Sequence, residues 1–183
     1  MTRSVCVFCG SAPGARASYS RAAEELGRAL AERSITLVYG GGRLGLMGLI
    51  ADATLKSGGR VIGVIPRMLI ERELAHPALT RQHVVATMHE RKTLMAELSD
   101  GFVGLPGGMG TFDELVEIVT WAQLGLHAKP VILVNVENYY ESLYGMLDYA
   151  VKEGFVTAES RARWRNADSV TRVMQILAGE GIS

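Results

Sequence analysis

The sequence contains few cysteines, no excess of charge and no long apolar run. Its 19 basic residues balance its 19 acidic residues, and this formal net charge of zero argues against broad nucleic-acid binding. No apolar stretch approaches the roughly 18 residues that cross a membrane. The apolar run near the N-terminus is too short for a secretion signal. We therefore expect a soluble, cytoplasmic protein that binds neither nucleic acid nor membranes.

The sequence also lacks a clear metal or redox centre. Its two cysteines, Cys6 and Cys9, have the C-x-x-C spacing of a redox pair, but they lie in and next to the apolar run 5–8. Residues three apart on a strand point to opposite faces, so we expect two inert thiols that cannot form a disulfide. The four histidines show no metal-ligand spacing. We expect no metal and no cofactor.

Apolar runs alternate with helical patterns along the chain, and 48% of its 183 residues are hydrophobic, enough for the core of one domain, residues 1–183. Strands are expected at residues 4–8, 35–39, 61–65, 83–86, 102–105 and 131–134. Helices are expected at residues 17–33, 46–56, 88–98, 111–124, 139–151 and 170–178. The alternation predicts a single-domain α/β fold with a doubly wound, Rossmann-like parallel sheet. In such folds, ligands bind beyond the carboxyl ends of the strands.

Residues Pro106–Glu114, with the sequence PGGMGTFDE, contain the most specific pattern. They follow an expected strand and open an expected helix. Gly107, Gly108 and Gly110 leave the backbone free of Cβ atoms, and a helix N-terminus offers unsatisfied N–H donors with a partial positive charge. This combination predicts an anion site, most often for phosphate. With Glu114 one turn into the helix, it indicates a nucleotide whose sugar is attacked.

The same residues allow a purely structural interpretation. Thr111 and Glu114 have the Thr-x-x-Glu spacing of a capping box, so both could serve only the helix start. Glu117 lies one turn beyond Glu114, and Thr120 continues that face. Apolar residues fill the other positions, so we expect this helix to be buried nearly all round. Carboxylates on a buried helix need partners.

Arg91, within the sequence MHERK, is the expected cationic partner. It follows the fourth expected strand and begins a helix at the strand-end edge that also carries the glycine loop. A guanidinium there could bind a phosphate bidentately or keep a carboxylate ionised, and the sequence does not choose between these roles. For an isolated arginine, a solvated helix face would be the favoured interpretation.

A second glycine pattern precedes the second expected helix. Gly40, Gly42 and Gly45 fit the dinucleotide motif G-x-G-x-x-G between a strand and a helix. An NAD site also needs an acidic residue at the end of the next strand, where residues 65–67 are Ile, Pro and Arg. We therefore favour a mononucleotide, with a tight turn and close helix packing as the alternative. The irregular residues 67–81 are expected to cover the site as a loop or short helix.

Together these motifs resemble the Lonely Guy family of cytokinin-activating phosphoribohydrolases. Besides PGGMGTFDE and MHERK, the matching segments are VFCGS at 7–11, LVYGGGRLGLMG at 37–48, VIGVIP at 61–66 and WAQLGLHAKPV at 121–131. The resemblance covers most of residues 4–156, and the residues beyond offer no functional match. The family was long described as lysine decarboxylases, but no lysine here stands in a context that suggests pyridoxal phosphate.

The resemblance implies hydrolysis of the N-glycosidic bond of N6-substituted adenosine 5′-monophosphates, to a free base and ribose 5-phosphate. It implies that Glu114 and Arg91 are the catalytic pair and that residues 107–111 hold the phosphate. The implied substrate-binding residues are Ser11, Gly41, Gly42, Glu73, Met88, Lys92, Gly107, Gly108, Gly110, Thr111, Glu117 and Thr120. It also implies a homodimer with active sites near the interface, where residues 121–127 serve packing or the dimer contact. A nucleosidase for AMP or other purine nucleotides, and a non-enzymatic nucleotide sensor, remain alternatives.

Overall fold

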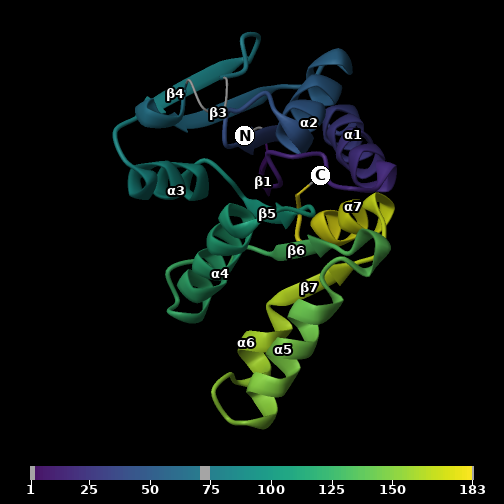
Figure 1. The fold of residues 1–183 in the computed structure, drawn as a ribbon, viewed down its shortest axis with the longest axis vertical. Helices are drawn as coiled ribbons and strands as arrows, with labels where there is room; N and C mark the ends of the chain where they lie inside the picture. The colour runs from purple at the N-terminus through teal and green to yellow at the C-terminus, as the bar shows by residue number, and fades with distance from the viewer. Residues whose placement is uncertain (1–2, 71–74, 183) are drawn as a thin grey trace.

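The computed structural model describes residues 3–70 and 75–182, and within them it contains one seven-stranded parallel sheet (Figure 1). The strand order is β4-β3-β2-β1-β5-β6-β7. The strands are β1 (Ser4–Phe8), β2 (Thr36–Tyr39), β3 (Val61–Pro66), β4 (Arg81–Val85), β5 (Gly101–Gly104), β6 (Val131–Val134) and β7 (Trp164–Ala167). The predicted doubly wound α/β fold is confirmed.

Helices cover both faces of the sheet (Figure 1). One face carries α1 (Ala17–Glu32), α2 (Gly45–Lys56) and α7 (Val170–Gly179). The other carries α3 (Met88–Glu97), α4 (Met109–Gln123) and α5 (Glu141–Lys152). The short helix α6 (Ala158–Ala162) and the 3₁₀ turns η1 (Arg67–Leu69) and η2 (Val136–Asn138) complete the chain.

The central strands show why two separate cores form. Val5 and Val7 of β1 pack with the α1, α2 and α7 side, whereas Cys6 and Phe8 pack with the α3, α4 and α5 side. A strand buried on both faces is apolar along its length, which is the pattern of β5, β6 and, after Ser4, β1. Cys9 belongs to the first core, so the two cysteines face opposite sides and both are free among the described residues, as predicted.

The chain order creates a crevice between β1 and β5. From β1 the chain runs outward through β2 and β3 to β4, then returns and runs the other way through β5, β6 and β7. The loops after β1 and β5 therefore leave the sheet in opposite directions, and such a switch point is where doubly wound folds bind ligands. The backbone N–H of Gly10, after β1, donates to the carbonyl of Pro106, after β5, at 3.1 Å.

Several sequence predictions need correction. The structure contains α6 and β7, which were not predicted, and α4 begins at Met109 rather than at residue 111. The expected helix at 139–151 begins only at Glu141, because residues 136–138 form the turn η2. The expectation that α4 is buried nearly all round was wrong, since Val116 is 49% exposed. One side of α4 packs against the core, and the opposite side, which includes Val116, is exposed.

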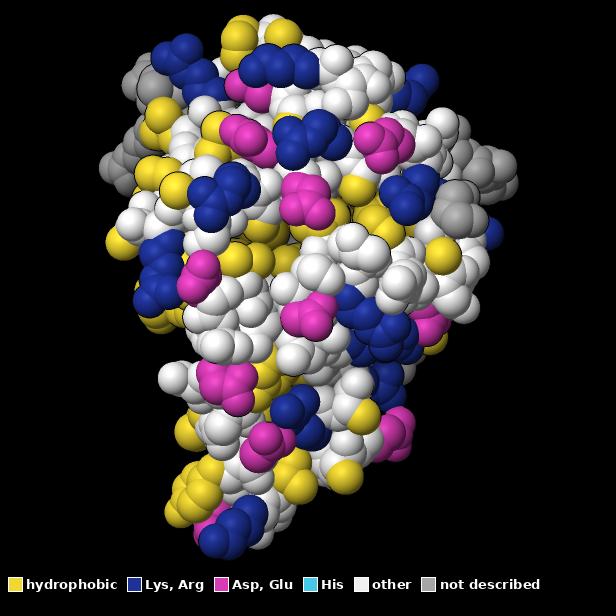
Figure 2. Space-filling model, turned by 90° about the vertical axis from the view of Figure 1, so that its right-hand side faces the viewer, with side chains coloured by type: hydrophobic (Ala, Val, Ile, Leu, Met, Phe, Trp, Pro, Cys, Tyr) yellow, Lys and Arg dark blue, Asp and Glu magenta, His cyan; other side chains and the backbone are white. Residues whose placement is uncertain are grey.

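Surface charge is mixed on the face that carries α1 and α7, where acidic and basic side chains are interspersed (Figure 2). Figure 2 also shows several basic side chains side by side on the right-hand part of this face, with acidic side chains next to them. Within residues 3–70 and 75–182, no helix has the length and apolarity to span a membrane.

Candidate active site

A cavity of about 190 Å³ opens at the switch point, beyond the carboxyl ends of β1, β2 and β5. Its lining comprises Cys9, Gly10, Ser11, Met47, Arg91, Gly108, Met109, Gly110, Thr111 and Glu114. The structure thus brings together six of the residues that the sequence predicted for the site. They arrive from three distant segments, the loop after β1, the start of α3 and the start of α4.

The start of α4 presents backbone donors to this cavity. Gly108, which has no side chain, is the N-cap residue, so the first helical N–H groups are left to a ligand or solvent. A Cβ added to Gly108 or Gly110 would meet no described atom within 4 Å, which shows that the space beside these glycines is open. Open N–H groups with a partial positive charge favour an anion here.

Thr111 is buried within the first turn of α4, and only 4% of it is exposed. The predicted capping box of Thr111 and Glu114 is wrong, because the N-cap lies three residues earlier at Gly108. Thr111 instead lines the cavity and packs closely against the glycine loop. A Cβ on Gly107 would lie 2.7 Å from the Cβ of Thr111, closer than real Cβ contacts allow, so this position requires glycine.

Arg91 is held in the cavity wall by the first turn of α3. Thr87 caps this helix by accepting from the Glu90 N–H at 3.1 Å, and the Glu90 carboxylate accepts from the Ala86 N–H at 2.9 Å. Arg91 is only 5% exposed, and its Nη2 donates to the carbonyl oxygen of Gly40 at 3.2 Å. The solvated-face interpretation of this arginine is therefore wrong.

The position of Arg91 explains why residue 40 is a glycine. A Cβ at position 40 would overlap Arg91 Nη2 and lie 3.1 Å from Cζ, so any side chain there would displace the guanidinium. The next glycines of the pattern serve the backbone. Gly45 has φ +56° and brings the start of α2 against Ser11, where the Leu46 N–H donates to the Gly10 carbonyl at 3.0 Å.

Glu114 is half-buried in the second turn of α4 and lines the same cavity as Arg91. Both charges act on Cys9, the thiol in the cavity wall. Burial, the largest cause, raises the pKa of Cys9 well above its ordinary value, the negative charge of Glu114 raises it further, and Arg91 lowers it. The thiol therefore stays protonated at neutral pH and is a poor nucleophile.

Lys92 links α3 to α4 beside the cavity. Its Nζ lies 3.1 Å from an oxygen of Asp113 and 2.9 Å from an oxygen of Glu117, and its side chain is 13% exposed. Burial lowers the pKa of Lys92, but its hydrogen bonds and charge interactions with Glu117 and Asp113 outweigh burial and raise it. The cationic partner of Glu117 is thus Lys92, whereas the sequence suggested Arg91 as the partner of the α4 carboxylates.

Of the remaining predicted substrate residues, those that the structure describes are not part of the lining of this cavity. The Met88 sulfur lies 3.9 Å from Arg91 Nη1, and the Thr120 hydroxyl donates to the Val116 carbonyl at 2.7 Å. Gly41 accepts from the His76 N–H at 2.9 Å, and Gly42 forms a β-bridge with Ala75. Glu73 lies outside the described residues. Both glycines thus anchor the segment that follows residue 74.

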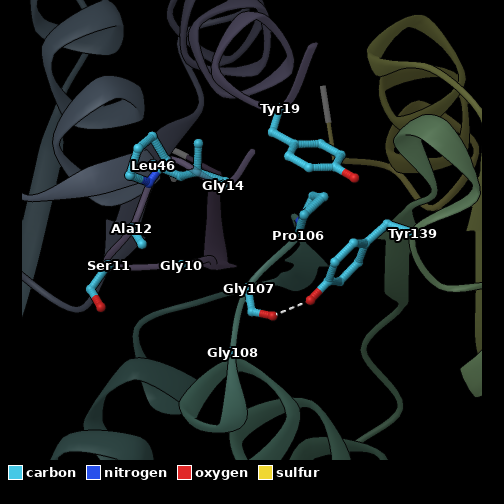
Figure 3. A pocket seen from close by; sticks show the side chains of 11 residues that line it. Gly10, Ser11, Ala12, Gly14, Tyr19, Leu46, Pro106, Gly107, Gly108 and Tyr139 are labelled. Carbon is cyan, nitrogen blue, oxygen red and sulfur yellow. Dashed lines mark hydrogen bonds between the residues drawn. The ribbon is translucent and has the colours of Figure 1, made fainter. Parts of the chain in front are cut away.

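A second cavity of about 200 Å³ adjoins the first and shares Gly10, Ser11 and Gly108 with it (Figure 3). Tyr19 and Tyr139 form its aromatic wall, and the Tyr139 hydroxyl donates to the carbonyl of Gly107. The sequence did not indicate a role in the site for these tyrosines, nor for Cys9, Met47 and Met109 in the first cavity. Gly10 and Cys9 were predictable as strand-end residues, whereas no local pattern marks the tyrosines.

Comparisons with known proteins identify the family. A family model described as "Possible lysine decarboxylase" matches residues 47–177. The chain is 54% identical over 159 residues to a probable cytokinin riboside 5′-monophosphate phosphoribohydrolase of Oryza sativa subsp. japonica, covering 87% of this chain and 65% of that relative. It is 51% identical over 162 residues to a cytokinin riboside 5′-monophosphate phosphoribohydrolase of Rhodococcoides fascians, covering 88% and 82%. This chain belongs to the Lonely Guy family.

Solved structures share the fold of this Lonely Guy family member at low identity. The X-ray structure of TM1055 superposes with a TM-score of 0.76 at 23% identity and covers 97% of this chain and 99% of its own. The Moco carrier protein from Chlamydomonas reinhardtii gives a TM-score of 0.73 at 21% identity and covers 98% and 97%. At these identities the similarity establishes the doubly wound fold alone.

Proposed function

We propose that this Lonely Guy family member hydrolyses the N-glycosidic bond of N6-substituted adenosine 5′-monophosphates, giving a free base and ribose 5-phosphate. The observation that carries the proposal is the shared cavity of Arg91, Glu114 and the start of α4. An anion-binding helix start beside a carboxylate and a guanidinium suits a phosphorylated sugar that is attacked at its anomeric carbon. The names of the relatives that are half identical to this chain support the same reaction.

In this proposal the phosphate binds first to the N–H groups of Gly108 to Thr111. The fixed phosphate places the ribose over the cavity, so binding energy far from the reacting bond positions the sugar. As the C1′–N bond breaks, its electron pair leaves with the base and positive charge grows on C1′. The carboxylate of Glu114 stabilises this charge and accepts a proton from the water whose oxygen bonds to C1′.

The departing base receives, through solvent, the proton that Glu114 took from the attacking water, which returns Glu114 to its carboxylate form. Arg91 assists the departure of the base or orients Glu114. The Gly40 carbonyl and the first turn of α3 fix the guanidinium within the cavity wall, which suits either role. The neutral Cys9 thiol does not compete with water as the nucleophile.

The substitution Glu114→Gln tests the proposal, with Glu153→Gln as the matched control. Glu153 is an exposed residue just after α5, so the control makes the same chemical change on the surface. The rate of base release from isopentenyl-AMP and from AMP should fall about 10²–10⁴-fold in Glu114→Gln and stay unchanged in the control. Ribose 5-phosphate and free base are quantified by chromatography. Unchanged release in Glu114→Gln would show that this carboxylate has no part in the reaction.

We propose further that the protein is a homodimer and acts as a single domain in the cytoplasm. Exposed apolar residues on and after α4 support a dimer contact: Val116 is 49% exposed, Leu124 68% and Leu126 69%. Apolar side chains that are exposed together mark interaction surfaces. The two free, buried cysteines suit a reducing compartment. Sedimentation of Leu124→Asp against the unchanged protein tests the dimer, since a monomeric variant supports this surface and an unchanged mass rejects it.

A further inference from the structure

The loop between β5 and α4 has its carbonyl groups bound by three separate donors. The Tyr140 hydroxyl donates to the Leu105 carbonyl at 2.6 Å, and the Gly10 N–H donates to the Pro106 carbonyl at 3.1 Å. The Tyr139 hydroxyl donates to the Gly107 carbonyl (Figure 3). Three successive peptide groups are therefore fixed in orientation just before the start of α4.

Fixing the Gly107 carbonyl also fixes the first N–H of the anion site. The carbonyl of Gly107 and the N–H of Gly108 belong to one planar trans peptide group, in which the two bonds point in opposite directions. Tyr139 holds the carbonyl toward the second cavity, so the Gly108 N–H points away from Tyr139 (Figure 3). A glycine loop has wide backbone freedom, and without this contact the peptide group could rotate.

The ring of Tyr139 is itself held by neighbouring aromatic rings. It packs edge-to-face on Tyr19 with centroids 5.8 Å apart and on Tyr140 at 5.1 Å, and it stacks on Phe112 at 6.4 Å. Such pairs favour defined relative orientations. Phe112 belongs to the first turns of α4, so the ring ties η2 and the start of α5 to the helix that presents the donors.

We propose that Tyr139 is a positioning residue for the phosphate group of the substrate. Its hydroxyl orients the peptide group between Gly107 and Gly108, so that the donors at the start of α4 converge on one phosphate. The inference rests on the proposed function, because it takes a phosphorylated sugar as the ligand. It assigns Tyr139 to binding of the phosphate and to neither the attack on C1′ nor the departure of the base.

The test is the substitution Tyr139→Phe, which keeps the ring and its aromatic contacts and removes the hydroxyl. The dissociation constant of ribose 5-phosphate, measured by titration calorimetry, should rise about 5–10-fold, the scale of one lost hydrogen bond. The KM for isopentenyl-AMP should rise by the same factor, while kcat changes less than about twofold. Binding of isopentenyladenosine, which lacks the phosphate, should not change.

Tyr144→Phe is the matched control, because it removes the hydroxyl of a buried tyrosine on α5 that donates to the Arg165 carbonyl at 3.5 Å and lines neither cavity. It should lower the melting temperature and leave the affinity for ribose 5-phosphate unchanged. If Tyr139→Phe does not fold, Tyr139→Leu, which also has no side-chain donor, should give the same pattern.

Two results would overturn the inference. One is an unchanged affinity for ribose 5-phosphate in a folded Tyr139 variant. The other is an equal loss of affinity for isopentenyladenosine, which would indicate general disruption of the site. Either result leaves the proposed function intact if the unsubstituted protein still releases base. Failure of the unsubstituted protein to bind ribose 5-phosphate and to release base would instead reject the proposed function and this inference together.

Discussion

Gly40→Ala should separate the activity of this protein from its stability. The added Cβ would overlap Arg91 Nη2, so the guanidinium must withdraw by about 1 Å, a displacement that costs about 10²-fold in rate at a catalytic site. The backbone of β2 need not move, because the obstructing atoms belong to the end of a flexible side chain and the Met47 sulfur lies at an ordinary 3.4 Å.

The expected loss of stability is modest. The withdrawal breaks the hydrogen bond from Arg91 to the Gly40 carbonyl, which as a charged hydrogen bond contributes about 1.5–3 kcal/mol. Replacing glycine also restricts the unfolded chain, which returns about 0.4–1 kcal/mol. The free energy of unfolding should therefore fall by about 1–2 kcal/mol, and the melting temperature by about 2–8 °C for a chain of this size.

The assay compares kcat/KM for isopentenyl-AMP with the melting temperature in two variants. Gly145→Ala is the matched control, because a Cβ at this exposed position in α5 meets no described atom within 4 Å. The control should keep full activity and gain slightly in stability, as alanine favours helices. Full activity in Gly40→Ala would refute the inference that Gly40 makes room for a functional Arg91. A collapse of the fold would refute the inference that the arginine yields before the backbone.

Two further predictions concern the loop before α4 and the ion pairs between α3 and α4. Under the proposed function, Gly107→Ala should raise the KM for isopentenyl-AMP about tenfold, because the new Cβ would lie 2.7 Å from the Cβ of Thr111 and must shift the glycine loop before α4; steady-state kinetics checks this, and an unchanged KM would contradict it. The pKa of Lys92 is raised in the folded protein, so its charged form stabilises the fold. This contribution is fully present at pH values below the ordinary pKa of lysine, about 10.4, and is lost as the pH rises through the raised pKa. Urea unfolding should therefore show stability falling more steeply above about pH 10.4 in the unsubstituted protein than in Lys92→Met, whereas parallel curves would show that the pairs with Asp113 and Glu117 add nothing.

The sequence predicted the sheet well where burial dictates every residue of a strand. The apolar runs at β1, β2 and β6 were located within one residue, since strands buried on both faces leave a continuous apolar pattern. The strand β7 was missed because it lies at the sheet edge and contains Arg165 and Asn166. Its pairing with β6 is a tertiary effect that a local pattern does not show.

The candidate site was predictable in part for a similar reason. Gly108, Thr111 and Glu114 follow β5 within ten residues, and Arg91 lies in the first turn of the helix after β4. The carboxyl ends of parallel strands meet at one edge of the sheet, so these residues were expected to lie together. The exact start of α4 was not predictable, because Gly108 and Gly110 disfavour a helix on their own. The contact from Tyr139 joins residues 32 apart in the chain and depends on how η2 packs against the loop.

The switch point also has a consequence for how the protein is made. The neighbours β1 and β5 pair Val5 with Gly101, so the ribosome must synthesise roughly a hundred residues before this pairing can close, a slow, non-local step. Ser11 emerges early, whereas Glu114 and Tyr139 emerge only after that strand. A nascent chain released before then would lack β5, β6 and β7 and the start of α4, and so would lack half of the residues that line the first cavity.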